Sequence, residues 1–141
     1  MANSEQNAPD PGMKTEDDVR DLEKLIVQLQ GVHIEISILA KKTPNDGLNL
    51  FKLKLVNNIL AKGNSILTGH YKPLESFTTF DESALPTNSD VTMVLPLYIE
   101  QAERFRSNNM VYHDYKWWYL VNGVASQIEG SRPTKIGTER K

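Results

Sequence analysis

The sequence predicts a mainly α protein, an antiparallel bundle of three long helices with a C-terminal β-hairpin packed against it. Three observations support this fold class. Apolar residues recur at helical spacing in two early segments, and a third segment repeats the pattern after residue 87. Near the C-terminus, an Asn122-Gly123 pair follows a run rich in aromatic and β-branched residues. The chain has 141 residues, enough for one domain with its own core. We place that domain at residues 15–130.

The first predicted helix begins after Thr15 and continues to about residue 42. Thr15 and Asp18 match a capping box, and the acids that follow Thr15 suit the positive end of the helix dipole. Gly31 weakens a helix by about 1 kcal/mol relative to alanine, but an apolar stripe with steps of three and four residues runs through it. The stripe consists of Leu22, Leu25, Leu29, Val32, Ile36 and Leu39.

The second predicted helix covers residues 48–67 and follows a turn at residues 43–47. Proline, asparagine, aspartate and glycine favour that turn, and its shortness predicts that the second helix returns antiparallel to the first. Gly69 is expected to end the helix. We expect its buried face to contain Leu48, Phe51, Leu55, Ile59 and Ile66, with Val56 and Leu60 beside them. Residues 70–86 have no helical period, and their length and two phenylalanines predict a loop that packs across the bundle.

The third predicted helix begins after Thr87, which forms a second capping pattern with Asp90. Pro96 removes one hydrogen bond from a helix, and the residues just before it would also suit a strand. We favour a kinked helix, because the apolar spacing continues through the proline. Its buried positions are expected to be Val91, Leu95, Tyr98, Ala102 and Phe105.

The predicted hairpin turns at Asn122-Gly123, the preferred pair for a type I′ turn. Simple pairing about this turn opposes Val121 to Val124, Tyr119 to Ser126 and Trp117 to Ile128. Trp117, Tyr119 and Val121 then share one face, and Trp118 and Leu120 share the other. One face must pack on the helices, so one of the two tryptophans is expected to face outward. Residues 1–14 and the basic tail 131–141 are predicted to be disordered.

Composition excludes several classes of chemistry. The chain has no cysteine, which removes disulfides, thiolate nucleophiles, zinc ribbons and iron–sulfur sites. His33, His70 and His113 are widely separated and the glycines are scattered, so neither a metal centre nor a phosphate loop nor another cofactor is expected. No apolar run is long enough to span a membrane, and we expect a cytoplasmic protein without a membrane partner. The net charge of −2 gives no overall attraction to nucleic acid.

One short pattern resembles a catalytic motif. Arg106 is followed, after six intervening residues, by His113, which is similar to the motif of the helical HEPN ribonucleases. The resemblance implies a dimeric helical bundle in which Arg106 and His113 would cleave RNA. Ser107 stands where that family favours asparagine, aspartate or histidine, and His113 falls in a strand-like run.

The aromatic cluster before the hairpin turn is the candidate binding surface. Aromatic side chains close to cations are typical both of protein interfaces and of surfaces that stack nucleic-acid bases. The residues expected to bind a partner are Tyr112, Tyr115, Trp117, Trp118, Arg104 and Arg106. We predict no catalytic residues and a non-enzymatic interaction module, an adaptor or small subunit, whose partner is another protein or a second copy. The alternative is a nucleic-acid-binding module that also uses Lys52, Lys54 and Lys62, and the HEPN-like ribonuclease is the remoter alternative.

Overall fold

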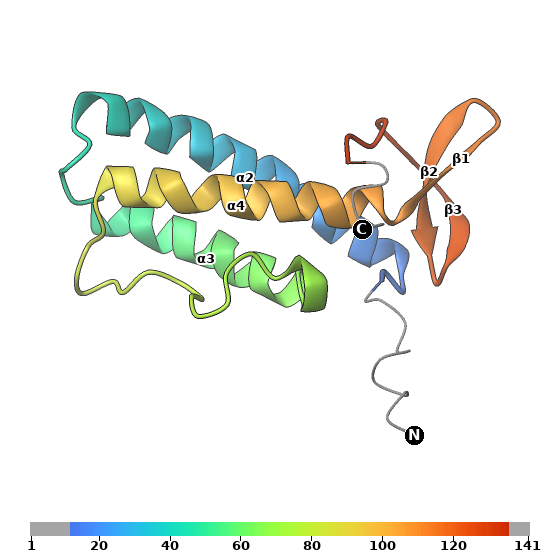
Figure 1. The fold of residues 1–141 in the computed structure, drawn as a ribbon, viewed down its shortest axis with the longest axis horizontal. Helices are drawn as coiled ribbons and strands as arrows, with labels where there is room; N and C mark the ends of the chain where they lie inside the picture. Colours follow the sequence, from blue (N-terminus) through green and yellow to red (C-terminus); the bar gives the residue numbers. More distant parts are fainter. Residues whose placement is uncertain (1–11, 136–141) are drawn as a thin grey trace, which may run out of the picture.

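The computed structural model describes residues 12–135, in which three long helices lie side by side and a small sheet covers one end of them (Figure 1). Residues 1–11 and 136–141, most of the two segments predicted to be disordered, lie outside the described residues. The elements in chain order are α2 (Glu16–Lys42), α3 (Leu50–Ile66), the short 3₁₀ helix η1 (Gly69–Tyr71), α4 (Asn88–Ser107), β1 (Met110–His113), β2 (Lys116–Val121) and β3 (Val124–Gly130).

Helix α2 begins and packs as its sequence predicts. The Asp18 amide donates to Thr15 Oγ1 at 3.1 Å, and the Thr15 amide donates to the Asp18 carboxylate at 3.1 Å, which completes the capping box. Most of the predicted stripe is buried, and Val19 extends it towards the N-terminus. The buried apolar residues of the helix are Val19, Leu22, Leu25, Leu29 and Ile36.

Only part of the face predicted for helix α3 is buried: Val56 and Leu60 lie in the core, and Ile59 and Ile66 pack against it. Phe51 is 74% exposed and Leu55 is also exposed, whereas Asn57 and Gly63 are buried with the leucines and valine of the core face. Asn57 is buried because its side chain donates to Phe80 O at 2.9 Å and accepts from Phe80 N at 3.0 Å. These bonds attach the long loop before α4 to α3, as the loop's two phenylalanines suggested.

Helices α3 and α4 run parallel to each other, and α2 is antiparallel to both (Figure 1). The N-terminal ends of α3 and α4 lie together, because Leu48 N donates to Pro86 O at 2.8 Å and Asn88 N donates to Asp46 O at 2.9 Å. At the other end Tyr71 stacks edge-on against Phe105, with ring centroids 5.1 Å apart. The prediction of an antiparallel bundle is therefore correct for the pairs that include α2 and wrong for α3 and α4. These two helices are parallel because the loop after η1 returns the chain to the N-terminal end of α3 before α4 begins.

Helix α4 confirms the preference for a helix over a strand. Thr87 caps it through a 3.0 Å hydrogen bond from Asp90 N, and the helix continues through Pro96 to Ser107. Pro96 lies on the exposed side. The five predicted core positions, from Val91 to Phe105, are all buried.

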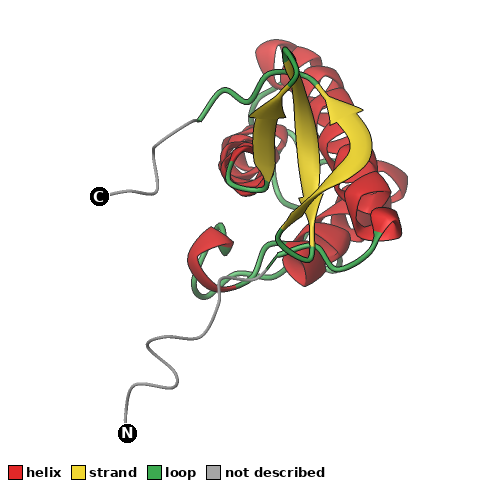
Figure 2. Cartoon of the chain, turned by 90° about the vertical axis from the view of Figure 1, so that its right-hand side faces the viewer, coloured by secondary structure: helices red, strands yellow, loops and turns green. Residues whose placement is uncertain are grey.

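The predicted hairpin is part of a three-stranded antiparallel sheet in the order β1-β2-β3 (Figure 2). The Asn122-Gly123 turn is confirmed, with φ of 55° and 76° at its two residues. Val121 pairs with Val124 as predicted, but the register shifts between Leu120 and Trp118, and Trp117 pairs with Gly130 instead of Ile128. The shift places residues 126–128 opposite Tyr119 alone, a bulge that simple pairing about the turn does not reveal.

Both ends of the described chain pack on the domain beyond the predicted limits 15–130. Met13 is buried, and its carbonyl accepts from Asn122 N at 2.8 Å. Pro133 is also buried, and residues 131–135 hydrogen-bond to α4. The prediction of a disordered tail from residue 131 is therefore wrong for residues 131–135, because α4 offers them a buried ion pair that local sequence does not show.

Candidate functional site

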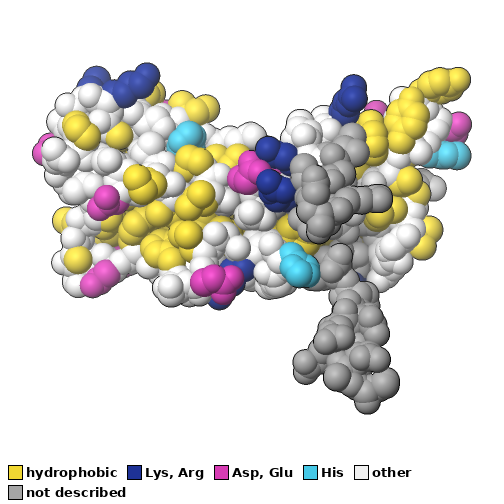
Figure 3. All heavy atoms as spheres, viewed as in Figure 1, with side chains coloured by type: hydrophobic (Ala, Val, Ile, Leu, Met, Phe, Trp, Pro, Cys, Tyr) yellow, Lys and Arg dark blue, Asp and Glu magenta, His cyan; other side chains and the backbone are white. Residues whose placement is uncertain are grey.

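The β1–β2 hairpin projects beyond the ends of the helices and carries most of the predicted site residues (Figures 1 and 3). We call residues 112–118 the aromatic tip. Tyr115 is 91% exposed and Tyr112 is 54% exposed. The Tyr112 ring lies against Trp117, with centroids 5.3 Å apart. The turn itself holds Asp114 and Tyr115 at φ of 54° and 63°, a left-handed conformation that non-glycine residues seldom adopt.

The alternation of β2 places its two tryptophans on opposite faces of the sheet, as predicted. Tyr119 is buried against the helices, and Trp117, on the same face, packs at the edge of the core. Trp118 is on the outward face, where its Nε1 donates to His113 O at 2.9 Å. A shallow hollow of about 340 Å³ lies beside it, lined by His113, Trp118, Ala125, Ser126 and Gln127.

Charges around the aromatic tip are balanced. Lys116 Nζ lies 3.9 Å from the Glu129 carboxylate and 6.0 Å from the centroid of the Trp118 ring. His113 Nε2 lies 3.5 Å from the Asp114 carboxylate. The tip therefore offers aromatic surface without a positive field around it.

Arg106 is not part of this surface. Its side chain is buried, and its five N–H groups are all engaged. Nε and Nη2 donate to the two oxygens of Glu103 at 2.8 and 3.0 Å, and the remaining donors reach Ser131 O at 2.9 Å, Arg132 O at 3.1 Å and Met110 Sδ at 3.2 Å. The arginine thus attaches the C-terminal segment to α4.

Two of the other basic residues proposed for binding, Arg104 and Lys54, also have acidic neighbours. Arg104 Nη2 lies 2.9 Å from Glu100, which also pairs with Lys135 at 3.0 Å. On α3, Lys54 Nζ lies 4.0 Å from Glu82. The structure therefore does not bring Arg104 and Arg106 to the aromatic tip.

The two residues of the ribonuclease-like pattern lie apart. Arg106 contacts the first residue of β1, Met110, whereas His113 is the last residue of that strand. Three residues of extended chain span about 10 Å. With every donor of Arg106 engaged in the fold, the arrangement gives the pattern no support.

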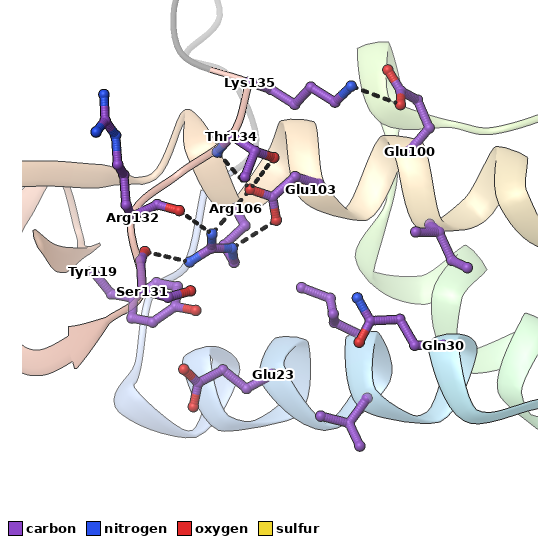
Figure 4. A pocket seen from close by; sticks show the side chains of 13 residues that line it. Glu23, Gln30, Glu100, Glu103, Arg106, Tyr119, Ser131, Arg132, Thr134 and Lys135 are labelled. Atoms are coloured by element: carbon purple, nitrogen blue, oxygen red, sulfur yellow. Dashed lines mark hydrogen bonds and ion pairs between the residues drawn. The ribbon is translucent and has the colours of Figure 1, made fainter. Parts of the chain in front are cut away.

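A groove between α2 and α4, which the sequence did not suggest, surrounds the Arg106–Glu103 pair (Figure 4). Its volume is about 610 Å³. Glu23 and Gln30 line it from α2, Glu100 and Glu103 from α4, and residues 131–135 close one end. Only the short spacing between Glu103 and Arg106 hinted at a pair in the sequence, since the other walls come from distant segments.

The surroundings of the groove shift the pKa of several of its side chains, among them Tyr119 and Glu103. Burial raises the pKa of Tyr119 to about 12, although Arg106 acts in the opposite direction. Burial alone would also raise the pKa of Glu103, but hydrogen bonds from Arg106 and Thr134 outweigh it and lower that pKa below its ordinary value of 4.5. The groove floor therefore keeps a neutral phenol and a charged carboxylate at neutral pH.

No group of three or more histidine, cysteine, aspartate or glutamate side chains is placed to hold a metal ion within residues 12–135. None of the helices in that part of the chain is long and apolar enough to cross a membrane. No family model, no curated protein and no solved structure matches this chain significantly.

Proposed function

We propose that this protein is a non-enzymatic interaction module, an adaptor or small subunit of a larger assembly, that binds a protein partner in the cytoplasm through its aromatic tip. The observation that carries the proposal is the exposure of Tyr115 and Tyr112 on a hairpin that projects from the helices. Tyrosine and tryptophan side chains are the commonest energetic anchors of protein interfaces. Exposed aromatic groups on a short, paired turn lose little conformational freedom when they bind.

The balance of charge favours a protein partner over nucleic acid. Binding to single strands requires cations along the backbone path in addition to stacking rings. At the tip, Lys116 lies close to Glu129, and the arginines expected to help are paired within α4. Rings without free cations around them match the centre of a protein interface.

A photo-crosslinking experiment tests the proposal. A photoreactive phenylalanine analogue replaces Tyr115 in the full chain. A matched variant carries the analogue at Phe51, which is 74% exposed in the first turn of α3. We expect irradiation in cells of the source organism to give one discrete protein adduct from position 115 and none from position 51. Equal adducts from both positions, no adduct from position 115, or an adduct with RNA would each contradict the proposal.

A further inference from the structure

Helix α2 has a second apolar stripe on its outer face, away from the core. Val27, Ile34 and Ile38 are 67%, 60% and 49% exposed. With Gly31 they are separated by four, three and four residues, which is the spacing of a coiled-coil seam. At 100° per residue this outer seam points nearly opposite to the buried stripe from Leu22 to Ile36. Hydrophobic side chains are visible at the upper edge of Figure 3, over α2.

Gly31 forms a notch in the outer seam. A Cβ atom built at this position meets no atom within 4 Å, so packing within the chain does not require a glycine there. Glycine in the middle of a helix also destabilises it. What the glycine does provide is room for a large side chain from outside, between Val27 and Ile34.

We propose that the outer seam binds the outer seam of a second copy of this chain, with the two α2 helices antiparallel. In that arrangement Ile34 of each copy fills the Gly31 notch of the other, and Val27 packs on Ile38. Both pairs are centred on the same point, midway between residues 32 and 33, so a single two-fold axis satisfies all the apolar positions. This self-complementarity is what a symmetric dimer requires.

The charges of α2 favour the antiparallel arrangement. Its first turn contains Glu16, Asp17 and Asp18, and its last turn contains Lys41 and Lys42. Antiparallel helices bring opposite charges and opposite dipole ends towards each other, whereas parallel helices would align like charges. About the same axis, Lys42 approaches Asp21 and Lys41 faces Lys24 of the second copy.

The size of the contact sets the expected affinity. The 27 residues of α2 span about 40 Å. A standard protein interface buries about 800 Å² of accessible surface on each partner, and one helix pair with this short seam buries less. We therefore expect dissociation in the micromolar range. The dimer leaves the aromatic tip exposed, so it is independent of the function proposed above.

Sedimentation equilibrium of the full chain over about 5–500 µM tests the dimer. We expect the mass to rise from 16.0 kDa towards twice that value. Gly31→Gln fills the notch and should raise the dissociation constant by about tenfold or more. Its melting temperature should not fall, because glutamine is the better helix former. Ile34→Gln should act in the same direction, and Phe51→Gln, the matched control on α3, should leave the dimer unchanged.

A charge reversal adds a gain-of-affinity test. Lys24→Glu replaces the one like-charged contact by an attractive pair with Lys41 and should lower the dissociation constant about threefold. A mass of 16.0 kDa at every concentration would overturn the proposal. So would a dimer that survives both seam substitutions, or one that Phe51→Gln weakens to the same extent.

Discussion

Removing the carboxylate of Glu103 should destabilise the protein far more than removing a carboxylate one turn earlier. Glu103→Ala leaves Arg106 buried without its counter-ion, with neutral acceptors such as Ser131 O and Arg132 O in its place. Breaking a buried pair by removing one partner costs about 3–5 kcal/mol. The Glu103 side chain is 19% exposed, which weakens the pair through solvent screening, so we expect about 3 kcal/mol. For a domain of this size that loss corresponds to a fall of about 10 °C in melting temperature.

Urea unfolding followed by circular dichroism measures this loss. The matched control is Glu100→Ala, because Glu100 pairs with Arg104 and Lys135 at a more exposed site on the same helix. Its expected cost is about 0.5 kcal/mol. A loss below about 1 kcal/mol for Glu103→Ala, or equal losses for both variants, would refute the description of a buried pair that anchors the C-terminal segment.

The Glu103–Arg106 pair should also make the stability of the fold depend on pH. The folded-state pKa of Glu103 is lowered from its ordinary 4.5, so its contribution to stability is complete above that value. It is lost as the pH falls below 4.5 through the folded-state pKa. The difference in unfolding free energy between the native chain and Glu103→Gln should therefore shrink in acid, and a constant difference from pH 6 to pH 3 would contradict this reasoning.

Two further predictions concern the junction between the sheet and the helices. Gly130→Ala should lower the free energy of unfolding by about 1–3 kcal/mol, because its Cβ would lie 2.7 Å from both Met110 Cε and Tyr119 Cε2. Gly31→Ala, where the new methyl meets no atom within 4 Å, should raise it, and chemical denaturation compares the two variants. The pKa of Tyr119 is raised from 10.0 to about 12, and burial also raises the pKa of Tyr98, so both phenols should ionise late in a titration of tyrosinate absorbance. The stability that burial of the neutral Tyr119 phenol provides should be lost as the pH rises from 10 to about 12. Tyr119→Phe should reduce the amplitude of the late step, and an unchanged amplitude in that variant would assign the step to other residues.

Local chemistry was sufficient to predict the elements whose determinants lie within a few residues. Three such features are confirmed, and each depends on neighbours in the chain: the Thr15 capping box, the apolar stripe of α2 and the Asn122-Gly123 turn. The outward position of Trp118 likewise follows from strand alternation once Tyr119 is known to face the core.

The errors arose where a distant partner decides the local structure. Asn57 is on the buried face of α3 because its side chain bonds to Phe80, 23 residues away. The strand β1 has four residues and ends in a left-handed turn at Asp114 and Tyr115 that contains no glycine, so the sequence carries no hairpin signal there. Arg106 looked like a surface base, since the carbonyls of residues 131 and 132 that bury it come from the end of the domain.

The most direct test of the proposed function is the affinity of the crosslinked partner for three purified chains: the native protein, the double variant Tyr112→Ala/Tyr115→Ala, and Phe51→Ala. Both tyrosines are more than half exposed, so the double variant should keep the native circular dichroism. We expect it to bind about 100-fold more weakly, with Phe51→Ala unchanged. Native affinity in the double variant, or an equal loss in Phe51→Ala, would show that the aromatic tip is not the binding surface.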